Sequence, residues 1–284
     1  MAYKDIVVLF DGGRGEDTRL RLAAELARRH HGYLTGLYAI EVAAAPIATP
    51  ALGSYAEAEA VQSAIAAARE ATSEVRAAAE SSFRDALQRA AIQGEWRVLE
   101  DSTVELASLH ARYADIAVLG QVDPDNPPAN APALPESVLM DSGRPVLIVP
   151  YVGHFETLGK NVLVAWNATR EAARATGDAL PLLTEAKTVT VLSFSPPGDI
   201  EAEGRLPASH LVEHLRRHGI AAEASTLPSG EIGVGDLILS RAADLTADLI
   251  VMGGYGHSRT REFIFGGVTR SLLQHMTVPV LMAH

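Results

Sequence analysis

The chain has 284 residues, 48% hydrophobic and 21% charged, which is typical of a soluble globular protein large enough for two domains. Its formal net charge of -11 disfavours binding to nucleic acid or to an anionic membrane, because both need clustered Lys and Arg. The lack of cysteine excludes disulfides, thiol catalysis and cysteine-ligated metals. No signal peptide pattern precedes the first apolar run, and no run reaches the roughly 18 residues that span a bilayer, so we expect a cytoplasmic protein.

Apolar runs alternate with helical patterns along the chain, which predicts an α/β fold with parallel sheets. In the first half we expect a lid or linker over 43–55 and then a long helix drawn from 57–91, among strands at 6–10, 33–40, 96–99, 116–119 and 146–149. In the second half the expected strands are 161–166, 188–194, 221–226, 249–252 and 280–282. A polar connection over 151–159 separates the halves.

The two halves resemble each other in sequence. Residues 6–10 followed by Asp11 look like residues 162–166 followed by Asn167. In the same order, residues 114–120 (A-D-I-A-V-L-G) match residues 247–253 (A-D-L-I-V-M-G), and residues 144–149 (R-P-V-L-I-V) match residues 278–283 (V-P-V-L-M-A). Three ordered matches indicate one unit that occurs twice. We therefore predict two domains, 1–151 and 152–284.

The most informative stretch, residues 247–271, reads A-D-L-I-V-M-G-G-Y-G-H-S-R-T-R-E-F-I-F-G-G-V-T-R-S. It predicts a buried strand, a glycine-rich turn, and a helix that starts at a second glycine pair. Glycines let the backbone approach a ligand, and the N–H groups of a helix start can hold phosphate. The spacing is neither G-x-G-x-x-G nor G-x-x-x-x-G-K-[ST]. Turn glycines without a ligand are the alternative interpretation.

The spacing resembles the G-x2-G-x9-G-[S/T] signature of nucleotide-binding universal stress proteins. Gly253, Gly256 and Gly266 lie on the pattern, and Gly267 stands where that family usually has Ser or Thr. The resemblance covers essentially the whole chain and implies two tandem, doubly wound, Rossmann-like domains. Each would have a five-stranded parallel sheet of order 3-2-1-4-5. The order reverses between strands one and four, and ligands bind at such a switch point.

The resemblance also implies that the units pair edge to edge through strand five, either within one chain or in a homodimer. Pro145 and Pro279, at the start of the two fifth strands, suit a sheet edge that is paired in this way.

In the family, the residue that ends strand one is usually an Asp that accepts hydrogen bonds from the base or ribose; here it is Asp11 in the first unit and Asn167 in the second. Alignment of the units carries Gly256 to Asp123, and the next glycine pair to about Pro132 and Ala133. A carboxylate 4 Å from a phosphate charge repels it by roughly 4 kcal/mol at an effective dielectric of 20. A helix N-terminus offers at most about 2 kcal/mol. We therefore expect no ATP in the first unit.

The expected adenine-nucleotide site lies in the second unit and comprises Ala165, Trp166, Asn167, Gly253, Gly254, Gly256, His257, Arg259, Gly266, Gly267, Val268 and Thr269. At Gly267 the missing hydroxyl loses one hydrogen bond, worth about 0.5–1.5 kcal/mol. Backbone N–H groups remain there, and Thr269 could replace the hydroxyl in part. Among Arg259, Arg261 and Arg270 we expect one phosphate partner.

Three histidines, His210, His214 and His218, recur every four residues on an expected helix. They could hold Zn²⁺ only with a further ligand such as Glu213. Because the neighbouring leucines supply the buried stripe of that helix, we expect the histidines to face solvent and name no metal site.

Catalytic motifs such as G-x-S-x-G and H-E-x-x-H are missing, so no catalytic residue is assigned. The sequence favours a regulatory protein that binds an adenine nucleotide, expected to be ATP, with or without Mg²⁺. A nucleotide-free interaction protein, or a binder of another small molecule, is the alternative. A slow ATPase is a weaker alternative, because Mg²⁺ needs only one or two carboxylates beside phosphates.

Overall fold

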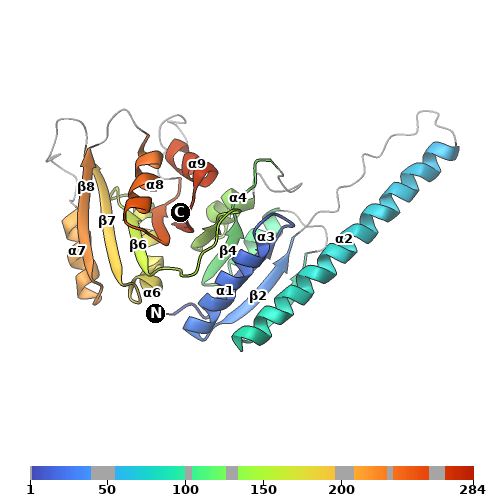
Figure 1. Ribbon diagram of the computed structural model, residues 1–284, viewed down its shortest axis with the longest axis horizontal. Coiled ribbons are helices and arrows are strands. Elements are labelled where there is room, and N and C mark those ends of the chain that lie inside the picture. Colours follow the sequence, from blue (N-terminus) through green and yellow to red (C-terminus); the bar gives the residue numbers. More distant parts are fainter. Residues whose placement is uncertain are drawn as a thin grey trace.

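The computed structural model describes residues 2–39, 55–99, 104–125, 134–195, 208–228, 233–255 and 266–284. In the first half the elements are β1 (Asp5–Phe10), α1 (Glu16–His30), β2 (Tyr33–Tyr38), α2 (Tyr55–Ala90), β3 (Gly94–Val98), α3 (Val104–Ala111), β4 (Ile116–Gly120), α4 (Leu134–Asp141) and β5 (Val146–Val149) (Figure 1). In the second half they are β6 (Asn161–Ala165), α5 (Arg170–Asp178), α6 (Leu180–Leu183), β7 (Thr188–Ser195), α7 (Ala208–Arg217), β8 (Ala222–Pro228), α8 (Val234–Asp244), β9 (Leu249–Gly253), α9 (Gly266–His275) and β10 (Val280–Ala283). All ten expected strands and the long helix are confirmed. The expected linker over 43–55 lies outside the described residues up to its last one, Tyr55, where α2 begins.

All ten strands form one sheet, in the order β3-β2-β1-β4-β5-β10-β9-β6-β7-β8. The first half therefore has the predicted order 3-2-1-4-5, and the second half repeats it in mirror sequence. Within each half the strands are parallel, whereas β5 and β10 pair antiparallel with Leu147 opposite Leu281. The halves thus join through strand five within one chain, and neither fifth strand remains a free edge.

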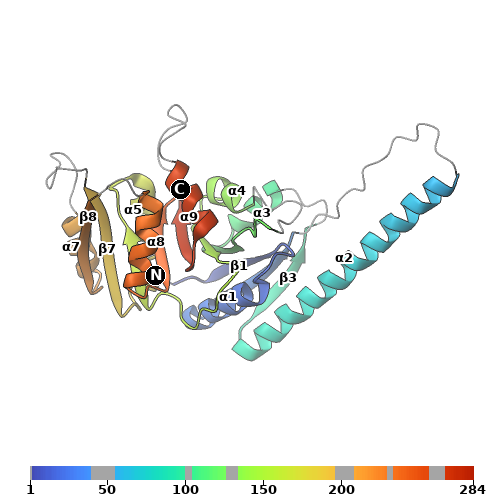
Figure 2. The same ribbon diagram turned by 45° about the horizontal axis from the view of Figure 1, so that its top comes forward.

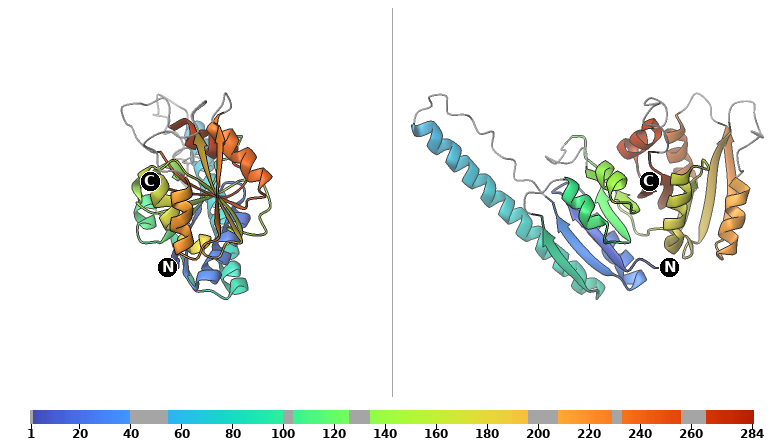
Figure 3. Two further views of the ribbon diagram at one scale, coloured as in Figure 1. Left: turned by 90° about the vertical axis from the view of Figure 1, so that its left-hand side faces the viewer. Right: turned by 180° about the vertical axis from the view of Figure 1, so that it is seen from behind.

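The helices cover both faces of this sheet (Figure 2). One hydrophobic cluster includes buried side chains of α1, α2, α5, α6 and α7, and a second includes those of α3, α4, α8 and α9. Strands covered on both faces can be apolar throughout, and every residue of β4, β5 and β10 is buried. A view from the side and a view from behind show the twist of the sheet and the end of α2 that extends beyond the body (Figure 3).

The repeated Ala-Asp pair before strand four has a structural role in both halves. Asp115 accepts hydrogen bonds from the backbone N–H groups of Lys4 and Asp5 at 2.6 and 3.1 Å. In the second half, Asp248 accepts from the N–H groups of Lys160 and Asn161 at 3.0 and 2.9 Å. Each carboxylate therefore satisfies donors at the start of strand one, which explains why the sequence keeps this pair twice.

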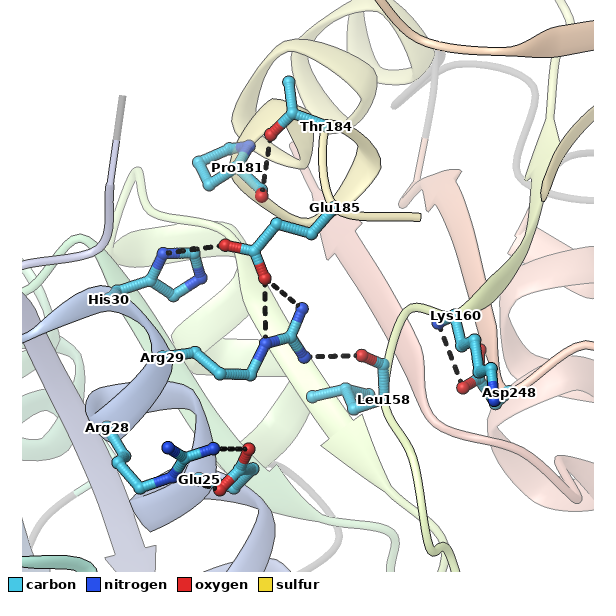
Figure 4. Close-up of polar contacts among 10 residues, drawn as sticks. All are labelled: Glu25, Arg28, Arg29, His30, Leu158, Lys160, Pro181, Thr184, Glu185 and Asp248. Carbon is cyan, nitrogen blue, oxygen red and sulfur yellow. Dashed lines mark hydrogen bonds and ion pairs between the residues drawn. The ribbon is translucent and has the colours of Figure 1, made fainter. Parts of the chain in front are cut away.

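A polar cluster joins the two halves on one face of the sheet (Figure 4). The Arg29 guanidinium of α1 donates to the Glu185 carboxylate beyond α6, from Nε at 2.9 Å and from Nη2 at 2.6 Å. Its Nη1 donates to the Leu158 carbonyl at 2.7 Å. The buried His30 ring lies 3.9 Å from the same carboxylate through Nδ1. The paired sheet edges are thus supported by side-chain contacts between the halves.

No helix in the described ranges combines the length and the hydropathy that crossing a membrane requires.

Candidate functional site

In the second half, β6 and β9 are neighbours at the switch point, with Ala165 opposite Met252. The predicted residues Trp166 and Asn167 therefore follow one strand end, and Gly253 and Gly254 lie at the other. A Cβ at Gly253 would lie 2.5 Å from the backbone nitrogen of Ala172 and 2.7 Å from the carbonyl carbon of Glu171. Glycine is needed here because it lets α5 begin directly against the end of β9.

The loop between β6 and α5 uses its polar side chains internally. Asn167 is exposed, and its Oδ1 accepts hydrogen bonds from Thr169 N at 3.2 Å and Thr169 Oγ1 at 2.8 Å. Thr169 in turn caps α5 by accepting from Ala172 N at 3.3 Å. Between them, Ala168 has a positive φ of 58°, which is unfavourable for a residue with a Cβ. The acceptor expected to meet a ligand is therefore engaged in shaping this loop.

Sequence reasoning missed Glu171, the second residue of α5. Its carboxylate is 1% exposed, and its Oε1 accepts from Arg170 Nε. In the described part of the chain, its Oε2 has no hydrogen-bond partner. Burial would raise the pKa of Glu171, but the hydrogen bond and charge of Arg170, together with smaller hydrogen-bond contributions, outweigh burial and lower it. The signal was available, because Glu171, Ala175 and Ala179 share one helix face at a spacing of four.

A second buried polar atom without a partner among the described residues lies on the preceding strand end. It is Nε1 of Trp166, whose ring packs against the cluster that includes α5 and α7.

Gly267, in the first turn of α9, is exposed, and apart from its neighbours in the helix no atom of the described residues lies within 4 Å of the position that a Cβ would take. Val268 is half-buried. Thr269 is 2% exposed, and its Oγ1 accepts from Tyr255 N at 3.4 Å, so its oxygen faces the chain that leaves β9. The predicted residues Gly256, His257 and Arg259 lie outside the described residues, whereas Gly266 begins the helix.

The chain beyond β9 also contacts the first half. A Cβ at Gly254 would lie 2.7 Å from the Cδ2 atom of Leu139 in α4. Reciprocally, Gln121 at the end of β4 donates from Nε2 to the carbonyls of Leu273 and Gln274 in α9 at 2.9 and 3.1 Å. Burial and the nearby Glu136 raise the pKa of Tyr255. The strand-four end of each half therefore packs against the last helix of the other.

The equivalent switch point of the first half is filled by a side chain. Arg19 is 1% exposed, and its Nη2 donates to Asp11 Oδ1 at 2.8 Å and to Glu16 Oε1 at 3.3 Å. A Cβ at Gly120, at the end of β4, would overlap the Arg19 guanidinium. Burial would raise the pKa of Asp11, but the charge and hydrogen bond of Arg19, together with backbone hydrogen bonds, outweigh burial and lower it. The strand-one carboxylate of this half is thus committed to an internal ion pair.

Asp123, which aligns with Gly256, lies in the loop three residues after β4 and is 2% exposed. Its Oδ1 accepts from Asp125 N at 3.0 Å, and its Oδ2 lies 3.4 Å from Arg14 Nη1. The expected carboxylate is therefore held in place beside the first switch point. Residues 126–133, including Pro132 and Ala133, lie outside the described residues.

His210 and His214 on α7 and His218 just after it are exposed, and Leu211 and Leu215 are buried, as predicted. The rings of His214 and His218 lie 4.8 Å apart. Within the described ranges, no group of three or more His, Cys, Asp or Glu residues could hold a metal ion.

Comparison with known proteins agrees with this architecture. Residues 159–284 match the model of the universal stress protein family. A universal stress protein from Archaeoglobus fulgidus DSM 4304 superimposes with a TM-score of 0.69 at 18% identity, over 98% of this chain and 97% of that chain. A functionally unknown protein from Pseudomonas aeruginosa PAO1 matches with a TM-score of 0.53 at 17% identity, over 99% of this chain and 92% of that chain. No curated protein matches. Residues 159–284 thus match the universal stress protein family, and the first half of the chain repeats the same strand order.

Proposed function

We propose that the second half binds an adenine nucleotide, ATP, at the switch point between β6 and β9, as a regulatory ligand rather than as a substrate. The observation that carries this proposal is the difference between the two halves. Apart from its neighbours in α9, no atom of the described residues lies within 4 Å of the Cβ position at Gly267, whereas in the first half the Arg19 guanidinium fills the ends of β1 and β4. We also propose the domain boundary at 151/152, within the connection between β5 and β6.

The start of α9 suits a phosphate group for two physical reasons. The first N–H groups of a helix have no partner within it, and the helix dipole favours negative charge there. Gly267 itself has no side chain to cover these donors, and among the described residues outside its own helix turn nothing lies within 4 Å of its Cβ position. Gly266, Gly267 and Val268 would supply N–H groups, and Mg²⁺, where present, would neutralise phosphate charge. The base and ribose would then lie toward Ala165, Trp166 and Asn167.

Further contacts are proposed from residues on both sides of the loop after β9. Gly253 and Gly254 would contribute through their backbone, since α5 and Leu139 take the space where their side chains would lie, and Thr269 would support the loop through Tyr255 N. Gly256, His257 and Arg259, in the segment outside the described residues, complete the proposed site.

The first half is proposed to serve as scaffold. The ion pair of Arg19 with Asp11 removes both a carboxylate acceptor and the space between the strand ends. Asp123 adds a negative charge beside them. Both features oppose a bound triphosphate.

The first experiment identifies the ligand. Small molecules are released from the purified protein by heat and analysed by mass spectrometry, and ATP binding is measured by calorimetry. The proposal predicts that an adenine nucleotide is released or that ATP binds with measurable affinity. If no nucleotide is released and no ATP binding is detected up to millimolar concentration, the proposal is contradicted.

A substitution locates the phosphate. Gly267→Asp places a carboxylate at the start of α9, where the helix tolerates it, and should weaken ATP binding at least tenfold. Gly267→Asn has nearly the same size without the charge and is the matched control. Equal ATP affinities in the two variants would contradict a phosphate site at the start of α9.

The second candidate function is that of a nucleotide-free interaction protein or a binder of another small molecule. The internal engagement of Asn167 and the missing hydroxyl at Gly267 favour it. A non-nucleotide ligand in the heat-release experiment would support this candidate. Slow ATP hydrolysis is tested separately by phosphate release, which we expect to stay at the level of the buffer blank.

A further inference from the structure

The carboxylate of Glu171 is the strongest remaining polar feature beside the second switch point. It is 1% exposed, and its Oε2 has no partner in the described ranges, although Oε1 accepts from Arg170. Leaving a buried carboxylate oxygen without a hydrogen bond is costly, so such an atom in a folded protein calls for a partner that joins later.

The position of Glu171 is fixed by the strand ends. A Cβ at Gly253 would lie 2.9 Å from Glu171 Cβ, so this side chain starts against the end of β9. Two residues beyond Gly253, Tyr255 N approaches Thr269 Oγ1 in the first turn of α9, at 3.4 Å. Glu171 therefore lies against the end of β9, and the chain that leaves β9 contacts the first turn of α9.

Asn167 is not available as the hydrogen-bond acceptor that the ligand was expected to meet. Its Oδ1 already accepts two hydrogen bonds from Thr169, so it is poorly placed to accept another from a ligand. Glu171, four residues later, has the free acceptor oxygen that Asn167 lacks. Resting on the proposed nucleotide function, we propose that Glu171 accepts a hydrogen bond from a ribose hydroxyl of the ligand and makes the site selective for a ribonucleotide.

The chemistry of a carboxylate favours this part of a nucleotide. A carboxylate repels phosphate oxygens and accepts strongly from hydroxyl groups. Ribose carries the hydroxyl donors of a nucleoside triphosphate and is bonded directly to its phosphates. With the phosphates at the start of α9, the ribose is the group that comes next toward the end of β9. The amino group of adenine is the other donor, and the experiment separates the two.

The test compares three ligands on each protein by calorimetry: ATP, 2′,3′-dideoxy-ATP, and purine riboside triphosphate, which lacks the amino group. The wild type should bind ATP at least about tenfold more tightly than the dideoxy ligand, the ratio that one hydrogen bond to a charged group provides. Glu171→Gln should reduce that ratio to about twofold. Because the ratio compares two ligands on one protein, any change in phosphate repulsion cancels.

Two further variants serve as controls for the proposed role of Glu171. Glu213→Gln removes an exposed carboxylate on α7 and should leave every ratio unchanged. If Glu171→Gln does not fold, Glu171→Asp keeps the charge on a shorter side chain and should reduce the dideoxy ratio in the same direction. Loss of discrimination only against the amino-free ligand would overturn the ribose assignment.

Wild-type protein that binds ATP but binds the dideoxy ligand equally well would overturn the role of Glu171 and leave the proposed function standing. Wild-type protein that binds none of the three ligands would overturn the proposed function, and the role of Glu171 with it.

Discussion

The two switch points of this chain have the same strands in the same order but different contents. In the first, the buried Arg19 joins Asp11 and Glu16 and leaves no space beside Gly120. In the second, the backbone of α5 packs against Gly253, and the free oxygen of Glu171 remains without a partner among the described residues. The same strand ends are therefore packed by different groups in the two halves, and the proposed single nucleotide site rests on that difference.

The largest expected effect is that of Arg19→Met, which leaves two carboxylates together without their cation. We expect the free energy of unfolding to fall by about 3 kcal/mol, the lower end for a broken buried ion pair, because Asp11 and Glu16 are partly exposed. Urea unfolding at pH 7 measures it. Arg28→Met breaks an exposed pair on the same helix and should change the unfolding curve little. Equal effects would contradict the special role of Arg19.

The same variant should change the acid dependence of stability. The pKa of Asp11 is lowered in the folded protein, so its contribution is present above its unfolded value of about 3.9 and is lost as pH falls below that. Without Arg19 this loss should shrink. Urea unfolding at pH 7 and pH 3 compares the two proteins; an unchanged pH dependence in Arg19→Met would show that Asp11 does not depend on Arg19.

Alanine should have different effects on stability at Gly253 and at Gly267, two glycines of the proposed site. Gly253→Ala places a methyl group against the rigid backbone of α5 and should lower the free energy of unfolding by about 2 kcal/mol. Gly267→Ala enters free space in a helix and should be neutral or slightly stabilising. Thermal unfolding of both variants tests the contrast. A reversed order would mean that the close approach at β9 is not maintained in solution.

Much of this architecture was predictable because it repeats. Strand positions follow from apolar runs, and the repeat itself indicated that one unit occurs twice. What the sequence could not provide were long-range partners. Nothing near Gln121 indicates that its amide reaches the carbonyls of α9, some 150 residues later. Nothing in the sequence indicated that Asp11 pairs with Arg19, because an arginine side chain is usually solvated.

The contact between the halves gives a third test. Gln121→Leu keeps the volume of the side chain but leaves the Leu273 and Gln274 carbonyls without their donor. The cost of unpaired buried groups predicts a loss of about 1.5 kcal/mol and faster hydrogen exchange at the end of α9. Gln88→Leu, at an exposed position of α2, is the control. Exchange in α9 as slow as in the wild type would show that this contact does not hold the helix.

The smallest expected effect is stabilising. Ala168 has a positive φ in the loop after β6, where Gly12 has the same conformation in the first half. Ala168→Gly should therefore raise the free energy of unfolding by about 0.5 kcal/mol, since the relief of strain exceeds the entropic cost of glycine. Ala173→Gly, at an exposed position inside α5, should lower it by about 1 kcal/mol. A loss of stability at both positions would contradict the loop conformation.

The most direct test of the difference between the halves is the number of nucleotides bound by each chain. Native mass spectrometry under saturating ATP should find one nucleotide per wild-type chain. It should find none in Gly256→Asp, which copies Asp123 of the first half into the second. Two nucleotides per wild-type chain, or one retained in Gly256→Asp, would contradict the account.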